Sequence, residues 1–168
     1  HVVQIEGNMK LRSSNGSLKV EEARGDLDAH TSNGSVSLNG FSGGAIVKTS
    51  NGSIRAAGVK GFFEATTSNG SVDARIDQAA ANRPIRVTSS NGKVVLEVQD
   101  LNGSDIYAST SNSSVTVRLP SSLNARLKAR TSNSSVNSDF EVNATGEISK
   151  KQLNGTIGSG GPIIDLHT

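Results

Sequence analysis

The chain has 168 residues and a mass of 17.3 kDa, which suits one domain, and only 33% of its residues are hydrophobic and 3% aromatic. The net charge of +2, from 17 Lys and Arg against 15 Asp and Glu, and the lack of interleaved aromatic residues exclude nucleic acid as the main partner. The absence of cysteine excludes disulfides and thiolate metal sites. The sequence contains no run of about 18 apolar residues, so no transmembrane helix is expected.

Serine, asparagine and glycine account for 26, 15 and 18 residues, and this bias is periodic. A Ser/Thr-Ser-Asn-Gly-Ser motif begins near residue 13 and recurs along the chain, with looser copies in the second half. Its central asparagines are Asn15, Asn33, Asn51, Asn69, Asn91, Asn112, Asn133 and Asn154. Their spacings of 18, 18, 18, 22, 21, 21 and 21 residues predict a repeat protein with one structural unit per motif.

Apolar and polar residues alternate on both sides of each motif, which is the pattern of a β-strand. Three columns of equivalent positions are apolar when the repeats are aligned, and we expect all three to be buried. Six residues before the asparagines are Met9, Leu27, Ala45, Phe63, Ile85, Ile106, Leu127 and Ile148. Three residues after them are Leu18, Val36, Ile54, Val72, Val94, Val115, Val136 and Ile157. Four residues before them are Leu11, Ala29, Val47, Ala65, Val87, Ala108 and Ala129, followed by the exception Lys150.

These columns predict an all-β fold: one parallel β-solenoid (β-helix) domain over residues 1–168, with about eight coils of 18–22 residues. The usual hand of parallel crossovers favours right-handed coils. Stacked asparagines should form a hydrogen-bonded ladder at one corner, where Asn-Gly suits a turn through positive φ. Asn112 and Asn133 are followed by Ser rather than Gly, so we expect tighter or differently shaped corners there.

The end of the sequence repeats the strand pattern once more. Ile164, Leu166 and Thr168 match, in residue type and spacing, the residues that stand six, four and two positions before a motif asparagine in the other repeats. We interpret them as the start of a ninth coil that is cut off at Thr168. The chain is then a mature segment or fragment of a longer protein, from which any upstream signal or anchor has been lost.

The segment Leu38–Ile54, LNGFSGGAIVKTSNGSI, resembles the coils of an adhesin-type β-strand-repeat family of bacterial envelope proteins, a domain of unknown function. Coils of that family read as apolar-x-apolar-x-Thr-x-Asn-Gly-x-Ile/Val, and the resemblance covers nearly the whole chain. It implies the solenoid fold and an exported or membrane-associated protein, extracytoplasmic or in the cell envelope of a bacterium. It brings no motif of catalytic residues.

Few residues have the arrangement of a catalytic or metal site. His1, His30 and His167 are far apart, so neither a metal nor another cofactor is expected. Asp28 and Glu64 share a column two coils apart, about 9.6 Å by strand spacing, which is a usable separation for polysaccharide cleavage. No aromatic sugar platform accompanies them, so solvated surface charge is the favoured interpretation.

A basic column is the stronger candidate for binding. This column consists of the residues three positions before the motif asparagines. It contains no acidic residue, and its first members are Arg12, His30 and Lys48. This charge suits an anionic glycan, a lipid headgroup or an acidic envelope surface. The alternative is that outward Lys and Arg only keep a long β-surface soluble.

Later coils are also longer than earlier ones. Three or four extra residues precede the next coil at residues 77–84, 100–105, 120–126 and 141–147. Insertions at one point of successive coils emerge on one face, which can bind a partner. Neutral drift in loop length is the alternative.

The leading hypothesis is a non-enzymatic bacterial cell-envelope protein whose rigid repeat surface serves adhesion, envelope sensing or assembly. A polysaccharide-cleaving β-helix enzyme is the first alternative, and an inert structural spacer is the second. Ice or mineral binding is disfavoured because the repeated Thr points inward and the outward columns are charged and irregular.

Overall fold

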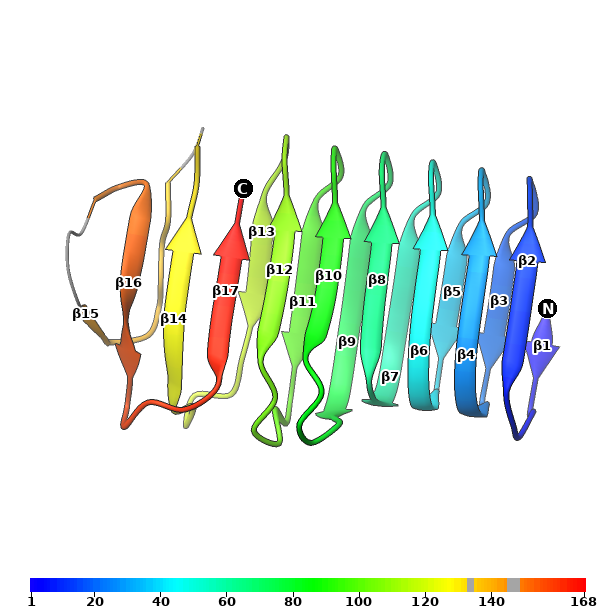
Figure 1. Cartoon of the computed structure of the whole chain (residues 1–168), viewed down its shortest axis with the longest axis horizontal. Helices are drawn as coiled ribbons and strands as arrows, with labels where there is room; N and C mark the ends of the chain where they lie inside the picture. The colour runs from blue at the N-terminus through cyan, green and yellow to red at the C-terminus, as the bar shows by residue number, and fades with distance from the viewer. Residues whose placement is uncertain (133–134, 145–148) are drawn as a thin grey trace.

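The computed structural model describes residues 1–132, 135–144 and 149–168, and these residues form 17 β-strands and no helix (Figure 1). Six successive coils each add one strand to a front sheet and one to a back sheet. The front strands are β2 (Met9–Ser13), β4 (Arg24–Thr31), β6 (Ser42–Thr49), β8 (Phe63–Thr67), β10 (Ile85–Ser89) and β12 (Ile106–Thr110). The back strands are β1 (Val2–Val3), β3 (Leu18–Glu21), β5 (Val36–Asn39), β7 (Ile54–Gly61), β9 (Val72–Ala79), β11 (Val94–Val98) and β13 (Val115–Arg118).

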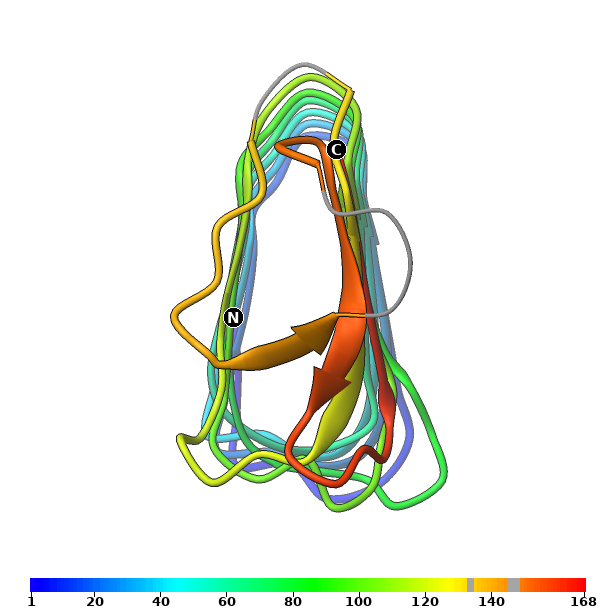
Figure 2. The ribbon, with the colours of Figure 1, turned by 90° about the vertical axis from the view of Figure 1, so that its left-hand side faces the viewer.

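Equivalent residues of successive coils pair in parallel within each sheet. In the front sheet Leu27 pairs with Met9 on one side and Ala45 on the other. Each front strand rises, crosses the upper corner and descends as a back strand while the chain advances, so the coils are right-handed (Figure 1). Viewed along the rod, the two sheets face each other and converge at the upper corner (Figure 2). The predicted parallel β-solenoid is therefore confirmed.

The three apolar columns fill the space between the two sheets. In the middle of the rod Phe63, Ile85 and Ile106 are completely buried. Leu18 in the first coil and Val115 in the last regular coil are only half-buried, because an end coil has a neighbour on one side only. The same partial burial applies to Leu11 and Val136, while Ile148 lies outside the described residues. The expected burial thus holds inside the stack and was wrong for these four half-buried positions.

The backbone of the upper corner differs from the prediction, because no Asn-Gly pair of the repeated motif, from Asn15-Gly16 to Asn91-Gly92, has a positive φ. Glycine is needed there for another reason. A Cβ would overlap the carbonyl oxygen of the glycine one coil earlier at Gly34, Gly52, Gly70 and Gly92. Positive φ occurs at the opposite corner instead, at Glu22 (51°), Gly40 (64°) and Gly58 (67°). The Asn-Gly corner is therefore a site of close backbone approach between coils.

Buried hydroxyl groups join each upper corner to the one before it. Thr49 Oγ1 accepts the N–H of Gly52 at 3.2 Å and donates to the carbonyl of Gly34 at 3.0 Å. The same pair of hydrogen bonds forms at Thr31, Thr67 and Ser89. These inward hydroxyls satisfy backbone groups that the strand ladders do not reach.

The predicted asparagine ladder runs along the exposed side of the same corner. Each side-chain amide donates from Nδ2 to Oδ1 of the preceding asparagine at 2.7 or 2.8 Å. The linked residues are Asn15, Asn33, Asn51, Asn69, Asn91 and Asn112. Asn133 lies outside the described residues. The prediction for Asn154 was wrong, because this residue lies within a strand, opposite Lys128 of an antiparallel neighbour.

Regular coiling ends after six coils rather than the predicted eight. The remaining strands are β14 (Ala125–Arg130), β15 (Val142–Ala144), β16 (Gln152–Ile157) and β17 (Ile163–His167). Strand β17 inserts between β12 and β14, so that Ile164 pairs with Ile106 on one side and Leu127 on the other. Strand β16 runs antiparallel to both β14 and β15, and β15 crosses the end of the rod (Figure 2).

The predicted ninth coil is therefore absent from this part of the chain. The prediction of which side chains point inward was correct, since Leu166 pairs with the inward-pointing residues Ala108 and Ala129 of the neighbouring strands. The predicted position was wrong, because the segment returns to the edge of the sixth coil. A strand can pair in parallel with another when its alternating apolar residues fall on the same core-facing side. Strand β17 has the same alternation as β12 and β14, so it can pair with both.

Candidate functional site

The outer face of the front sheet carries the candidate binding residues. Side chains in β2, β4 and β6 alternate between the core and the solvent. Arg12 pairs with His30, and His30 pairs with Lys48, across these three strands. The register therefore brings the predicted basic column together as a single row on the surface.

A hollow of about 560 Å³ follows this row beside the upper corner. We call it the basic groove, and its lining includes Arg12, His30 and Lys48 together with the serines Ser14, Ser32 and Ser50. Guanidinium, ammonium and hydroxyl groups are all hydrogen-bond donors. The lining therefore has the donor set that an acidic group of a ligand requires.

Asp28 modifies the charge of the basic groove. Its carboxylate lies 3.2 Å from Arg12 Nη2 and 2.7 Å from His30 Nε2. Lys48 forms no ion pair with any residue that the structure describes. Asp28 thus holds the side chains of Arg12 and His30 in place and offsets the charge of Arg12, while Lys48 remains available to an incoming anion.

The proposed pairing of Asp28 with Glu64 as catalytic carboxylates gains no support from this geometry. Ile46 pairs with both residues and separates them, as the columns predicted. Asp28 is engaged with Arg12 and His30 rather than directed at Glu64. The ion pairs give Asp28 a role in arranging the basic side chains.

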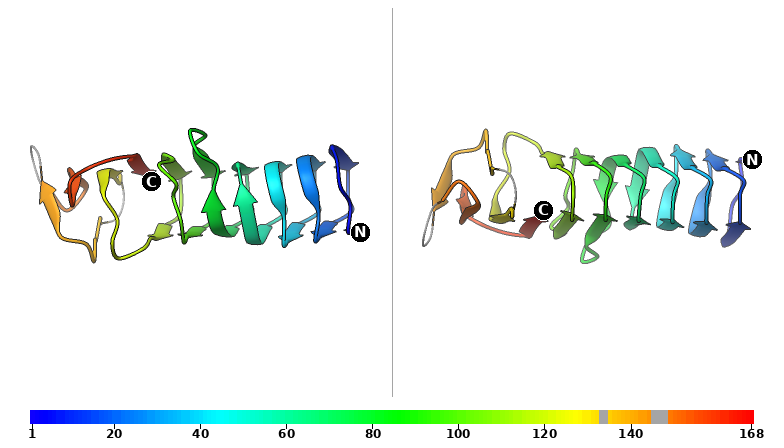
Figure 3. Two further views of the ribbon diagram at one scale, coloured as in Figure 1. Left: turned by 90° about the horizontal axis from the view of Figure 1, so that it is seen from below. Right: turned by 90° about the horizontal axis from the view of Figure 1, so that it is seen from above.

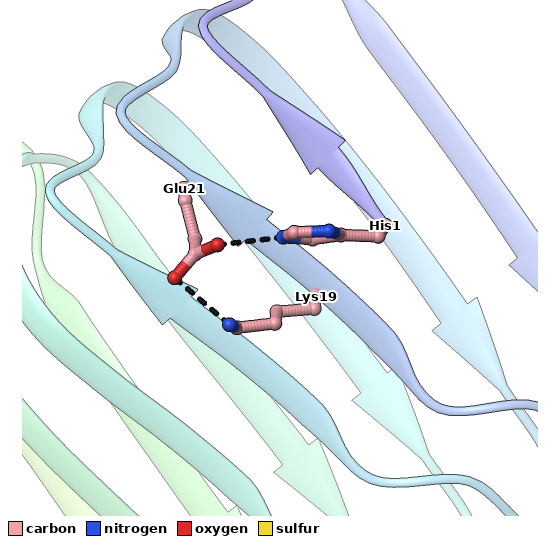
Figure 4. Close-up of polar contacts among 3 residues, drawn as sticks. All are labelled: His1, Lys19 and Glu21. Atoms are coloured by element: carbon pink, nitrogen blue, oxygen red, sulfur yellow. Dashed lines mark hydrogen bonds and ion pairs between the residues drawn. The ribbon is translucent and has the colours of Figure 1, made fainter.

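The back sheet carries charges that compensate one another locally. Glu21 on β3 lies 2.6 Å from His1 Nε2 and 3.0 Å from Lys19 Nζ (Figure 4). Arg75 on β9 similarly lies 3.6 Å from Asp77 and 3.8 Å from Glu97. Exposed pairs of this kind each contribute about 0–1 kcal/mol and leave little unbalanced charge. The front face is therefore the better candidate for binding an anion.

A second hollow, of about 370 Å³, lies beside the basic groove on the front face. We call it the Gly44 hollow, because Gly44 lines it between Asp26 on one side and Phe62 on the other. Its lining also includes Asp28, Ile46 and Arg83. Asp26, Gly44, Phe62 and Arg83 were not predicted from the sequence as candidate site residues. The available signal was the irregular column seven residues before the asparagines, where Asn8, Asp26, Gly44 and Phe62 follow one another.

One insertion contributes to this hollow. The loop between β9 and β10 projects on the side of the front sheet (Figures 2 and 3). It places the guanidinium of Arg83 3.9 Å from the centre of the Phe62 ring. The insertion thus adds a side chain to the front face near the candidate groove.

Other kinds of site are not found in the described part of the chain. No group of three or more His, Cys, Asp or Glu side chains is placed there to hold a metal ion. Within the same residues, no helix has the length and apolar character needed to cross a membrane. A scan against protein-family models found no match, and searches of curated proteins and of solved structures found none either. The function is therefore inferred from the front face and from the resemblance of the repeats.

Proposed function

We propose that this protein is a non-enzymatic binding protein of the bacterial cell envelope, whose rod holds an anionic glycan in the basic groove. The observation that carries the proposal is the single row of Arg12, His30 and Lys48, which paired strands hold in register. Neighbouring strands are about 4.8 Å apart, so donors from adjacent coils reach the same acidic group. The serine hydroxyls beside the row supply further donors.

The expected affinity is modest. Exposed charges attract an anion weakly, and salt at physiological strength screens them over about 8 Å. Many copies of the protein on one surface would raise the avidity without any new contact. An adhesive or surface-sensing role is consistent with such weak and repeated contacts.

The envelope location rests on the resemblance of the repeats to an adhesin-type family. A rod that aligns equivalent side chains of successive coils on its outer face is suited to presenting a surface. Adhesion, envelope sensing and assembly all use a surface of this kind, and the glycan contact is common to the three.

Binding of an oligogalacturonide, an acidic sugar oligomer, tests the proposal. Calorimetry at 20 mM and 300 mM NaCl should detect binding that weakens as the salt concentration rises. Lys48→Ser should reduce binding more than Arg12→Ser, because Arg12 is already paired with Asp28. Lys60→Ser, which removes an exposed lysine outside the groove, is the matched control. Equal loss in Lys48→Ser and Lys60→Ser would show that only net charge matters and would overturn the assignment of the groove.

The two alternatives predict other outcomes. A polysaccharide-cleaving enzyme would release shortened products, and Asp28→Asn or Glu64→Gln would abolish this release. An inert spacer would neither bind the oligomer nor cleave it. Binding to anionic lipid vesicles without binding to the sugar oligomer would assign the groove to a membrane surface instead.

A further inference from the structure

The Gly44 hollow exists because one coil lacks a side chain where its neighbours have large ones. Asp26, Gly44 and Phe62 occupy equivalent positions in three successive coils. A Cβ on Gly44 would lie 2.6 Å from Asp26 Oδ1 and 3.8 Å from Phe62 Cδ1. The carboxylate and the aromatic ring thus approach the vacant position from opposite sides.

Phe62 is unusual for an outward position, because only 9% of its surface is exposed. Arg83 covers one face of its ring at 3.9 Å. A cation held over a ring is attracted to its π-face and restricts its movement. Phe62 therefore supplies a fixed apolar wall on one side of the hollow, and Ile46 adds apolar surface from the strand that carries Gly44.

The two sides of the hollow suit different parts of a sugar ring. Carboxylates such as Asp26 and Asp28 accept hydrogen bonds from sugar hydroxyls. Lys10 and Arg83 also line the hollow and balance these two carboxylates, so the lining has no excess of positive charge that would attract an acidic sugar. The apolar wall suits the C–H face of the ring. The hollow, with balanced charges and an apolar wall, thus suits a neutral sugar.

We infer that the Gly44 hollow is a second subsite, which binds a neutral sugar of the same oligosaccharide whose acidic sugar is held in the basic groove. This inference rests on the proposed function. Asp28 lines the hollow and is ion-paired with Arg12 and His30 of the groove, so the two sites share a boundary. Gly44 and Lys48 are four residues apart on β6, about 13 Å along the strand. An oligosaccharide with alternating acidic and neutral units places one unit at each site.

Hyaluronan octasaccharide, which alternates acidic and neutral sugars, is the probe for this inference, and the oligogalacturonide of equal length is its all-acidic counterpart. Gly44→Val fills the hollow and should weaken hyaluronan binding about tenfold, the effect of losing a hydrogen bond to a charged group. It should leave oligogalacturonide binding unchanged. The substitution suits the backbone, because Gly44 has no positive φ and its nearest neighbour is a carboxylate at the end of a side chain.

Two controls separate the subsite from general effects on the surface. Ser37→Val adds the same side chain to the outer surface of the back sheet and should change neither affinity. Asp26→Asn should weaken hyaluronan binding, whereas Asp73→Asn on the back sheet should not. Circular dichroism and the thermal midpoint check that each variant is folded.

The outcomes for the subsite and for the groove are distinct. Hyaluronan binding that depends on Lys48 but is unaffected by Gly44→Val and Asp26→Asn would overturn the subsite alone. Binding of a neutral chitin oligomer that depends on Gly44, without binding of either acidic oligomer, would support the hollow and overturn the proposed function. No binding of any oligomer would overturn both.

Discussion

Residues 9–118 and residues 119–168 have the same apolar spacing and related Ser-Asn motifs, but their strands pair differently. In the first region every front strand pairs in parallel with the front strand of the next coil. In the second region β17 separates β14 from β12, and β16 runs antiparallel to β14. Apolar spacing therefore specifies which residues face the core, but it does not alone specify which strands are neighbours.

The upper corner has a glycine in the first five coils and a serine in the sixth, which is the last regular coil. Gly52, Gly70 and Gly92 are buried against the preceding coil, at positions where a Cβ would overlap a backbone carbonyl. Ser113 occupies the next equivalent position and is half-buried. The regular stack and the described asparagine ladder end with this coil. We infer that close approach of glycine backbones stabilises the stacking of the first five coils, and that its loss at the sixth coil permits a different arrangement of the strands that follow.

The largest expected effect comes from adding a methyl group at this contact. Gly70→Ala should lower the free energy of unfolding by about 3 kcal/mol, the upper end of the usual cost of overpacking, because its Cβ meets the backbone of Gly52. Gly16→Ala is the matched control in the first coil, where the new Cβ meets only Ser13 Oγ, at 2.9 Å. Its effect should be within about 0.5 kcal/mol. Urea unfolding measures both, and equal losses would contradict the close-approach explanation.

A smaller effect should distinguish asparagines inside and outside the ladder. Asn69 takes part in two amide hydrogen bonds, with Asn51 at 2.7 Å and Asn91 at 2.8 Å. Asn69→Ala should therefore cost about 1–2 kcal/mol of stability, since each bond contributes about 0.5–1.5 kcal/mol. The buried Oδ1 of Asn154 accepts no hydrogen bond from any described residue, so Asn154→Ala should be neutral or slightly stabilising. Thermal unfolding that ranks the two variants in the opposite order would contradict this assignment.

Much of the regular region could be predicted from the sequence because its pattern is strictly periodic. A fixed 18-residue spacing places Leu27, Ala45 and Phe63 in one column, and the core follows from that alignment. The C-terminal pairing could not be predicted in the same way. Strands β14 and β17 both present apolar residues at the spacing that the edge of β12 accepts, so periodicity does not choose between them.

The candidate site shows a similar division. The row of Arg12, His30 and Lys48 follows directly from strand register, and the structure places it as predicted. The ion pairs of Asp28 could not be predicted, because its side chain reaches residues two positions along its own strand and on a neighbouring strand. The Gly44 hollow was missed because it depends on a missing side chain and on Arg83, which an insertion contributes.

Strand β17 lies between β12 and β14 in the irregular region, and disulfide cross-linking tests this position most directly. Ser109 on β12 pairs with His167 on β17, which pairs in turn with Arg130 on β14. Ser109 and Arg130 are therefore two strands apart, about 9.6 Å, whereas a disulfide joins Cα atoms about 4.4–6.8 Å apart. The chain has no cysteine of its own, so each introduced pair reports on one contact.

Mild oxidation of two double variants, followed by mass spectrometry under non-reducing conditions, distinguishes the two arrangements. Ser109→Cys with His167→Cys should form an intramolecular disulfide, and Ser109→Cys with Arg130→Cys should remain reduced. The reverse result, with Ser109→Cys linked to Arg130→Cys and not to His167→Cys, would place β14 directly against β12. Regular coiling would then continue past the sixth coil, which would contradict the account.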